Sequence, residues 1–358
     1  MRIVLGLLTP FIAYAFMTGV HMLIPVARTR GYVRHETTGQ VLYYRINGKF
    51  VLWVSIAVWW LLGHFGIVAF TWLYDTRWYG LMGACVIGLA FSVYVVVRQP
   101  PTGKRFLADF WFGREKDPQI GDGFVDAKLW VYMIGAVMLQ LNVLSCVAHH
   151  LATADHVNPG FLAACAMLTW FCWDYLTFEK VHLWTYDFIA ERFGFKLAFG
   201  CLAFYPYFYA VALWFTAGLP NPGWPAGFTL VGATLFLFGW VLTRGANMQK
   251  YFFRTAPGRR FLWFTPEALT DGDHALLVNG YWGVSRHVNY LGEIIQALAV
   301  ALVIGYPGVW AVWLYPVYYV GLLFSRQADD DKVCAAKYGP LWDEYTEHVK
   351  RRIIPFLY

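Results

Sequence analysis

Long apolar runs separated by short polar segments divide the chain from end to end. A helix needs roughly 20 predominantly apolar residues to cross the hydrocarbon core of a bilayer. Nine runs meet this requirement, at residues 3–26, 50–71, 78–97, 129–150, 158–178, 194–218, 226–243, 288–305 and 307–325. A tenth apolar stretch, residues 276–284, is too short to cross. The pattern predicts an all-α fold, a polytopic membrane helix bundle with about nine to ten transmembrane helices and no soluble second domain.

Composition agrees with a membrane protein, since 59% of the residues are hydrophobic and only 14% are charged. Soluble domains carry roughly 25% charged residues, so an ordinary soluble globule and a disordered chain are both excluded. The cysteines match no zinc or haem spacing, and five of the six lie within apolar runs. We interpret these five as small buried hydrophobic residues: Cys85, Cys146, Cys165, Cys172 and Cys201.

The positive charges lie in alternate loops. Lys and Arg are frequent in residues 28–49, 98–128 and 244–272. The connections that alternate with these segments, at 72–77, 151–157, 219–225 and 305–307, contain a single basic residue of this kind, Arg77. Basic loops of membrane proteins stay in the cytoplasm, so the N-terminus is predicted outside and the C-terminal tail inside. The net charge of +6 then reflects cytoplasmic loops, and no nucleic-acid partner is expected.

Several familiar sites are missing from the sequence. No G-x-G-x-x-G follows a predicted strand, and no P-loop, G-x-S-x-G or H-E-x-x-H motif occurs. His149, His150, Asp155 and His156 are close enough in sequence to suggest a metal site. Their spacing defines no coordination geometry, so we favour a solvated cluster at the membrane interface and predict no metal.

The C-terminal third combines basic, acidic and aromatic residues in a way suited to binding a polar ligand. It contains Gly280-Tyr-Trp-Gly-Val-Ser-Arg-His-Val-Asn-Tyr-Leu-Gly292 and Ser325-Arg-Gln-Ala-Asp-Asp-Asp-Lys-Val-Cys334, followed by Lys337-Tyr-Gly. These segments resemble the patterns G-W-W-G-x-S-R-H-x-N-Y-x-G and H-R-E-x-R-D-E-x-x-C-x-x-K-Y-G of the sterol reductase family. That family includes delta-14 and delta-7 sterol reductases and the membrane domain of the lamin B receptor.

The resemblance continues upstream in the same order. Tyr44-Arg-Ile-Asn-Gly48 matches the family's Y-R-I-N-G, and Asp109-Phe-Trp-Phe-Gly-Arg-Glu115 matches its D-F-x-x-G-R-E. Residues 179–187 are similar to an E-x₇-D segment, 194–200 to G-F-x-L-x-F-G and 206–209 to P-F-x-Y. The likeness therefore extends from about residue 20 to the end of the chain.

The resemblance implies NADPH-dependent reduction of a carbon–carbon double bond in a sterol, of the delta-14, delta-7 or delta-24 type. Residues 1–358 would form one membrane domain, with seven spans in 1–243 and a coenzyme-binding part in 244–358. The implied acid residues are Asp330, Tyr209 and Glu179. The implied coenzyme-binding residues are Lys250, Arg254, Trp282, Arg286, His287, Asn289, Tyr290, Arg326 and Tyr338. The sterol would enter from the membrane lipids and the coenzyme from the cytoplasm, in a bacterial inner membrane or the endoplasmic reticulum.

The chain departs from the family pattern at four places. Residues 25–48 fit the connection after the family's second span, so we expect one helix fewer than the family has, in agreement with nine crossings in place of ten. Asp329 replaces an Arg and Ser325 replaces a His in the C-terminal motif, and Ile134-Gly135 replaces an Arg-Pro pair. The changes at 325 and 329 affect the expected contacts with nucleotide phosphate.

Three other functions remain open at this point. Isoprenylcysteine carboxyl methyltransferases resemble the same C-terminal stretch, although they are shorter and lack the Y-R-I-N-G and G-R-E elements. A non-catalytic sterol-binding membrane protein and a transporter are the other two, and the lack of an inverted repeat argues weakly against transport. The sequence leaves open which double bond is reduced.

Overall fold

The computed structural model describes residues 1–36, 38–121 and 123–358. Its packing divides the chain into two compact units, Met1–Pro222 and Gly223–Tyr358. Helices dominate both units, and the described strands form three two-stranded antiparallel sheets. The predicted all-α class is confirmed.

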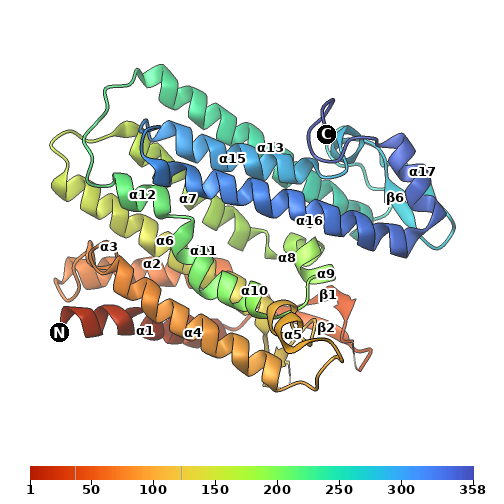
Figure 1. Cartoon of the computed structure of the whole chain (residues 1–358), viewed down its shortest axis with the longest axis horizontal. Helices are drawn as coiled ribbons and strands as arrows, with labels where there is room; N and C mark the ends of the chain where they lie inside the picture. The colour runs from red at the N-terminus through yellow and green to blue at the C-terminus, as the bar shows by residue number, and fades with distance from the viewer. Residues whose placement is uncertain (37, 122) are drawn as a thin grey trace. The chain divides into compact units, whose positions relative to one another are not determined.

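The first unit is built around a buried helix, α6 (Ala127–Thr153). In Figure 1, α1 lies beside α4, with which it packs directly. The other helices of this unit are α1 (Arg2–Leu23), α2 (Gly48–His64), α3 (Trp72–Asp75), α4 (Arg77–Val97), α5 (Phe106–Phe112), α7 (Pro159–Thr177), α8 (Glu179–His182), α9 (Tyr186–Ile189), α10 (Phe195–Phe199), α11 (Tyr205–Phe208) and α12 (Val211–Thr216).

The second unit begins with α13 (Ala226–Thr255), which packs along α15 (Val288–Val303). Gly239 of α13 and Gly292 of α15 allow this approach, because a Cβ atom on Gly292 would lie 2.4 Å from the Gly239 oxygen. Small residues let helix backbones pack closely in membranes. The unit continues with β5 (Ala268–Thr270), β6 (Ala275–Leu277), α14 (Tyr281–Val284), a 3₁₀ helix (Trp310–Trp313), α16 (Leu314–Tyr338) and α17 (Pro340–His348).

Five helical segments among the described residues are long and apolar enough to cross a membrane: Arg2–Leu23, Arg77–Val97, Ala127–Thr153, Phe195–Thr216 and Ala226–Thr255. Large apolar side chains are exposed on the outer faces of α1 and α13, including Ile12, Leu230 and Val231. Such faces are stable in contact with lipid and not with water. The protein is therefore a multi-pass membrane protein. Residues 276–284 contain the end of β6 and the four-residue α14, which is too short to cross a bilayer.

The predicted span at 194–218 is helical but interrupted. A π-helical turn, Gly200–Phe204, separates α10 from α11, and Tyr209 and Ala210 separate α11 from α12. Pro206 has no N–H to donate along the helix. The Pro206 carbonyl accepts a hydrogen bond of 2.9 Å from the Asn142 amide of α6. π-Helical turns within helices occur frequently at functional sites.

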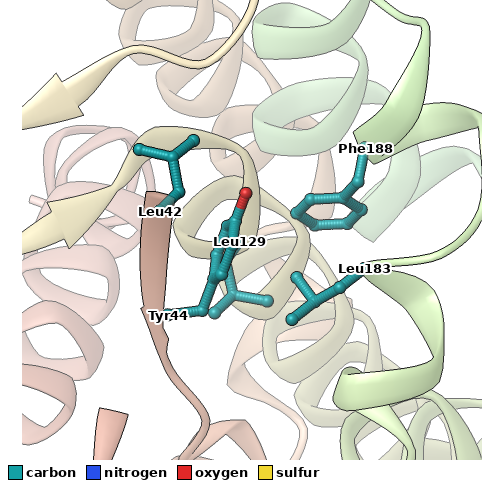
Figure 2. Close-up of a cluster of buried hydrophobic side chains, with 5 residues drawn as sticks. All are labelled: Leu42, Tyr44, Leu129, Leu183 and Phe188. Atoms are coloured by element: carbon teal, nitrogen blue, oxygen red, sulfur yellow. The ribbon is translucent and has the colours of Figure 1, made fainter. Parts of the chain in front are cut away.

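Residues between the first two spans form a β-hairpin that the sequence pattern did not predict. Strand β1 (Arg28–Arg34) pairs with β2 (Val41–Arg45), and Leu42 and Tyr44 of β2 are buried. Figure 2 shows these two side chains packed with Leu129 of α6 and with Leu183 and Phe188. The Y-R-I-N-G and E-x₇-D segments therefore meet in one hydrophobic cluster.

A buried ion pair lies close to this cluster, near the short strands β3 (Gln119–Ile120) and β4 (Val125–Asp126). The Lys128 ammonium is 3.2 Å from the Asp117 carboxylate, with both side chains almost fully buried. It also donates to the backbone oxygens of Asp187, Phe188 and Glu191. Lys128 thus ties the start of α6 to the residue 187–191 segment.

The D-F-x-x-G-R-E segment, residues 109–115, connects the end of α4 with α5. Asp109 accepts a 2.9 Å charged hydrogen bond from Arg114, whose guanidinium also donates to the Val96 and Gln99 carbonyls. Gly113 has φ +92°, and a Cβ atom there would lie 2.2 Å from the Phe193 oxygen. Only glycine fits both requirements. Two of the family's motifs, at 109–115 and 194–200, are therefore in backbone contact.

Candidate active site

The second unit contains a polar cluster where α13, residues 280–290, α16 and the C-terminal tail meet. Helix α16 is apolar at its start and polar beyond Ser325. Gln327, Asp330, Asp331 and Cys334 follow one another at spacings of three, one and three, which places them near one face of the helix. This face forms one wall of the cluster.

Residues 280–292 form the opposite wall because hydrogen bonds dock them on α13. The Trp282 indole donates to the Ala246 oxygen at 2.9 Å, and Thr243 donates to the Asn289 oxygen at 2.9 Å. Gly280 has φ +65°, and a Cβ atom there would meet the Gln249 amide at 2.3 Å. Gly280 is thus required by its conformation and by the space available.

The C-terminal tail completes the cluster. The backbone N–H groups of Arg286 and His287 donate to the oxygens of Arg351 and Arg352 at 2.9 and 2.8 Å. The Arg286 guanidinium is buried and donates to the Val349 and Lys350 oxygens and to Asp331. Arg286 therefore holds the tail in place, a role that the sequence did not suggest.

His287 lies between two carboxylates. Its Nδ1 atom is 3.7 Å from an Asp330 oxygen, and its Nε2 atom is 3.5 Å from an Asp331 oxygen. The ring stacks on Tyr290, with centroids 5.0 Å apart. Both ring nitrogens can therefore interact with a carboxylate at the same time.

The expected coenzyme residues on α13 lie on one helical face, as their spacing predicts. The Lys250 ammonium is 5.3 Å from the centre of the Trp282 ring, and both side chains are half-buried. Arg254 follows one turn later and is also half-buried. A partly buried lysine, an arginine and an aromatic ring are a donor set that suits a nucleotide with phosphate groups.

The other expected coenzyme residues are placed around the same unit. Asn289 donates to the Asn247 side chain at 3.4 Å. Arg326 is half-buried on α16, and the Tyr338 ring at the end of α16 stacks on Trp342 with centroids 6.4 Å apart. The direct contacts among the expected site residues are those of Lys250 with Trp282 and of His287 with Asp330. Arg286 and Asn289 mainly connect elements of the fold.

The two remaining acid candidates belong to the first unit. Glu179 is buried on α8, just beyond α7, and its carboxyl group accepts a 3.0 Å hydrogen bond from the Gly48 N–H at the start of α2. Burial raises the pKa of Glu179 to about 8, so a protonated form is present at neutral pH. Tyr209 lies at the break between α11 and α12, 4.7 Å from the Tyr205 ring centre. The approach of either residue to Asp330 stays a prediction.

The histidine cluster matches its predicted environment only in part, because Asp155 and His156 are exposed whereas His149 is half-buried. His150 is fully buried, which contradicts the expected solvated position. Its Nδ1 atom is 2.8 Å from the Ala217 oxygen, and its Nε2 atom accepts from the Asn158 N–H at 2.9 Å. The described residues contain no group of three or more His, Cys, Asp or Glu placed to hold a metal ion. Of the five cysteines expected to be buried, four are buried and Cys85 is half-buried.

The fold is that of a helical membrane protein whose second unit carries this polar cluster. A family model described as the ergosterol biosynthesis ERG4/ERG24 family matches residues 6–358. The chain belongs to this family. The predicted membership of the sterol reductases is thereby confirmed.

Individual relatives cover most of the chain. The Delta(14)-sterol reductase of Arabidopsis thaliana is 30% identical over 370 residues, covering 96% of this chain and 94% of that protein. The Delta(14)-sterol reductase of Methylotuvimicrobium alcaliphilum is 31% identical, covering 89% of this chain and 76% of that protein. The mouse Delta(14)-sterol reductase TM7SF2 is 36% identical, covering 70% of this chain and 59% of that protein.

Proposed function

We propose that this protein reduces the delta-14 double bond of a sterol with NADPH. The observation that carries the proposal is the near full-length similarity to Delta(14)-sterol reductases of a plant and a bacterium. In the structure, residues of the motifs shared with the family connect neighbouring elements or line the polar cluster of the second unit. The segments 44–48 and 109–115, which methyltransferases of the isoprenylcysteine type lack, are among the connecting segments, so the methyltransferase alternative is less favoured.

Reduction of an isolated double bond needs a proton at one carbon and a hydride at its neighbour. Bound NADPH would supply the hydride. An alkene is a very weak base, so the protein must hold an acid close to the reacting carbon and exclude water. We assign proton delivery to Asp330, with Tyr209 or Glu179 as its partner. The sterol ring system would reach these residues from the lipid.

The coenzyme fits the donor set of the second unit. Lys250, Arg254 and Arg326 would hold its phosphates through charge-assisted hydrogen bonds, and Trp282, Asn289, Tyr290 and Tyr338 would line its path. Asp329 replaces a family Arg and is exposed on α16, where it pairs with Lys332 at 3.3 Å. Asp in place of Arg removes a positive charge and adds a negative charge close to the residues that would bind the phosphates. We therefore expect a preference for NADPH that is weaker than a site with Arg would give.

Reconstituted protein tests the function directly. Liposomes with the purified protein should receive delta-14, delta-7 or delta-24 sterols together with NADPH or NADH, and the products should be identified by mass spectrometry. We expect only the delta-14 sterol to gain two hydrogens, faster with NADPH than with NADH. Liposomes without protein are the control. Reduction at another double bond, faster turnover with NADH, or methyl transfer from S-adenosylmethionine would each contradict the proposal.

We also propose that the coenzyme site faces the cytoplasm. The basic residues of 28–49, 98–128 and 244–272 support this orientation through the positive-inside rule. A protease-sensitive tag before Met1 should be cleaved from outside the cytoplasm, and a tag after Tyr358 only from the cytoplasmic side. Tags cleaved from the same side would mean an even number of crossings and would refute this topology.

A further inference from the structure

Four side chains converge on the carboxylate of Asp331, which the sequence did not single out. Gln327 donates to it at 2.7 Å, and Arg286 donates to the same oxygen at 3.3 Å. The Arg352 guanidinium lies 3.7 Å away, and His287 Nε2 is 3.5 Å from the other oxygen. These partners come from α16, from the 280–290 segment and from the tail.

The tail residues that reach Asp331 are themselves held. The Tyr358 hydroxyl donates to the Gln327 side chain at 3.2 Å and accepts from Arg352 at 3.0 Å. The Tyr358 ring stacks on Phe324, with centroids 5.2 Å apart. Gln327 is 1% exposed, so it has little freedom to leave Asp331. The network therefore defines where the Asp331 carboxylate lies.

His287 links this network to Asp330. Its side chain is 6% exposed, whereas Asp330 is 24% exposed, so Asp330 is the more accessible end of the chain of contacts. The ring stacks on Tyr290 and contacts Asp331. The His287 backbone N–H donates to the Arg352 oxygen, which holds the main chain of this residue against the tail. A ring held at these points presents Nδ1 in one direction, toward Asp330.

We propose that Asp331 is a positioning residue that acts through His287 on Asp330, the group assigned to proton delivery. The inference rests on the proposed function, because it gives Asp331 a part in the same reaction. Asp331 orients the imidazole, the imidazole orients the Asp330 carboxyl group, and the tail residues Arg352 and Tyr358 keep Asp331 in place. The groups therefore follow in the order Asp331 carboxylate, His287 imidazole and Asp330 carboxyl group.

Asp331 is unsuited to be the proton donor itself. Burial raises the pKa of its carboxyl group, but the hydrogen bond from His287 and the charge of Arg286 outweigh burial and lower the pKa below its usual value. Asp331 therefore remains ionised at neutral pH. An ionised carboxylate fits the positioning role, in which it accepts hydrogen bonds from several donors.

A double-mutant cycle on turnover tests the proposal. Asp331→Asn should lower kcat about tenfold to hundredfold, because small displacements of a reacting group are costly. The family pattern has Glu at this position, so Asp331→Glu should keep kcat within about threefold of the wild-type value. In an Asp330→Asn background, Asp331→Asn should change kcat less than about twofold, since the residue it positions is gone. Exposed Asp343→Asn is the matched control.

A cycle on melting temperature gives a readout that does not depend on the reaction. The effects of Asp331→Asn and His287→Gln on the melting temperature should be non-additive, because the two residues are in contact. If wild-type protein reduced no sterol while this coupling was present, the proposed function would fail and the contact chain would stand. Three results would overturn the positioning role. They are additive changes in melting temperature for Asp331→Asn and His287→Gln, additive losses of kcat for Asp331→Asn and Asp330→Asn, and an Asp331→Glu variant that loses as much kcat as Asp331→Asn.

Discussion

Replacing Asp330 with Asn should remove most turnover and leave the fold and coenzyme binding intact. Asn has nearly the same shape, and its oxygen can still accept from His287 and from the Cys334 thiol, which lies 3.8 Å from Asp330. The change removes the ionisable proton. General acid catalysis typically contributes ~10²–10⁴-fold, and the loss of kcat should fall in this range. Turnover with a saturating delta-14 sterol and NADPH measures it.

Two further variants identify the partner acid. Tyr209→Phe should lose activity to a similar extent if the phenol donates the proton, and less than about tenfold if the ring only packs against Tyr205. Glu179→Gln tests the buried carboxyl group and keeps an acceptor for the Gly48 N–H. Near wild-type rates for both Asp330→Asn and Tyr209→Phe would exclude these two residues as the acid. Glu179 would then be the leading candidate.

Lys128→Met should destabilise the first unit strongly. The change leaves the Asp117 carboxylate and three backbone oxygens buried without their cationic partner. Breaking a buried ion pair by removing one partner costs about 3–5 kcal/mol. Burial already raises the pKa of Asp117 despite the opposing effect of Lys128, so loss of the lysine removes the group that favours the ionised form. Thermal unfolding in detergent, followed by circular dichroism, measures the loss.

A more exposed ion pair provides the control. Lys196 is 3.0 Å from Glu191, which is buried, but the Lys196 side chain is about a third exposed, so Lys196→Met should cost less than Lys128→Met. The double variant Lys128→Met with Asp117→Leu should recover part of the stability, because it removes the uncompensated charge. Equal losses of stability for Lys128→Met and Lys196→Met would show that the fully buried pair contributes no more than the partly exposed one.

The apolar pattern of the sequence was sufficient to predict the class of the fold. Helices occur within each of the nine predicted runs, although α2 ends at His64, inside the run 50–71, and five described segments are long and apolar enough to cross. The short stretch at 276–284 was excluded as a span because it is too short to cross. The motifs identified the family. Their glycines, such as Gly113 and Gly292, are explained by the structure, because a Cβ atom at either position would clash with the backbone of a neighbouring element.

Contacts between distant segments were decided only by tertiary structure. The hairpin at residues 28–45, the pairing of Lys128 with Asp117 and the burial of His150 all depend on packing that apolar periodicity does not encode. The interruption at 200–210 was likewise hidden, because the segment is apolar throughout.

The acidic triplet at 329–331 shows the physical reason most clearly. Apart from the family motif, which singles out Asp330, nothing in the sequence distinguishes the surroundings of the three carboxylates. Successive residues of a helix point about 100° apart, so each carboxylate has a different environment. Asp329 is 60% exposed beside Lys332, while Asp330 and Asp331 take the two sides of His287. The sequence by itself determined that three acids are present on a helix; the packing of residues 280–290 and of the tail determined what each one contacts.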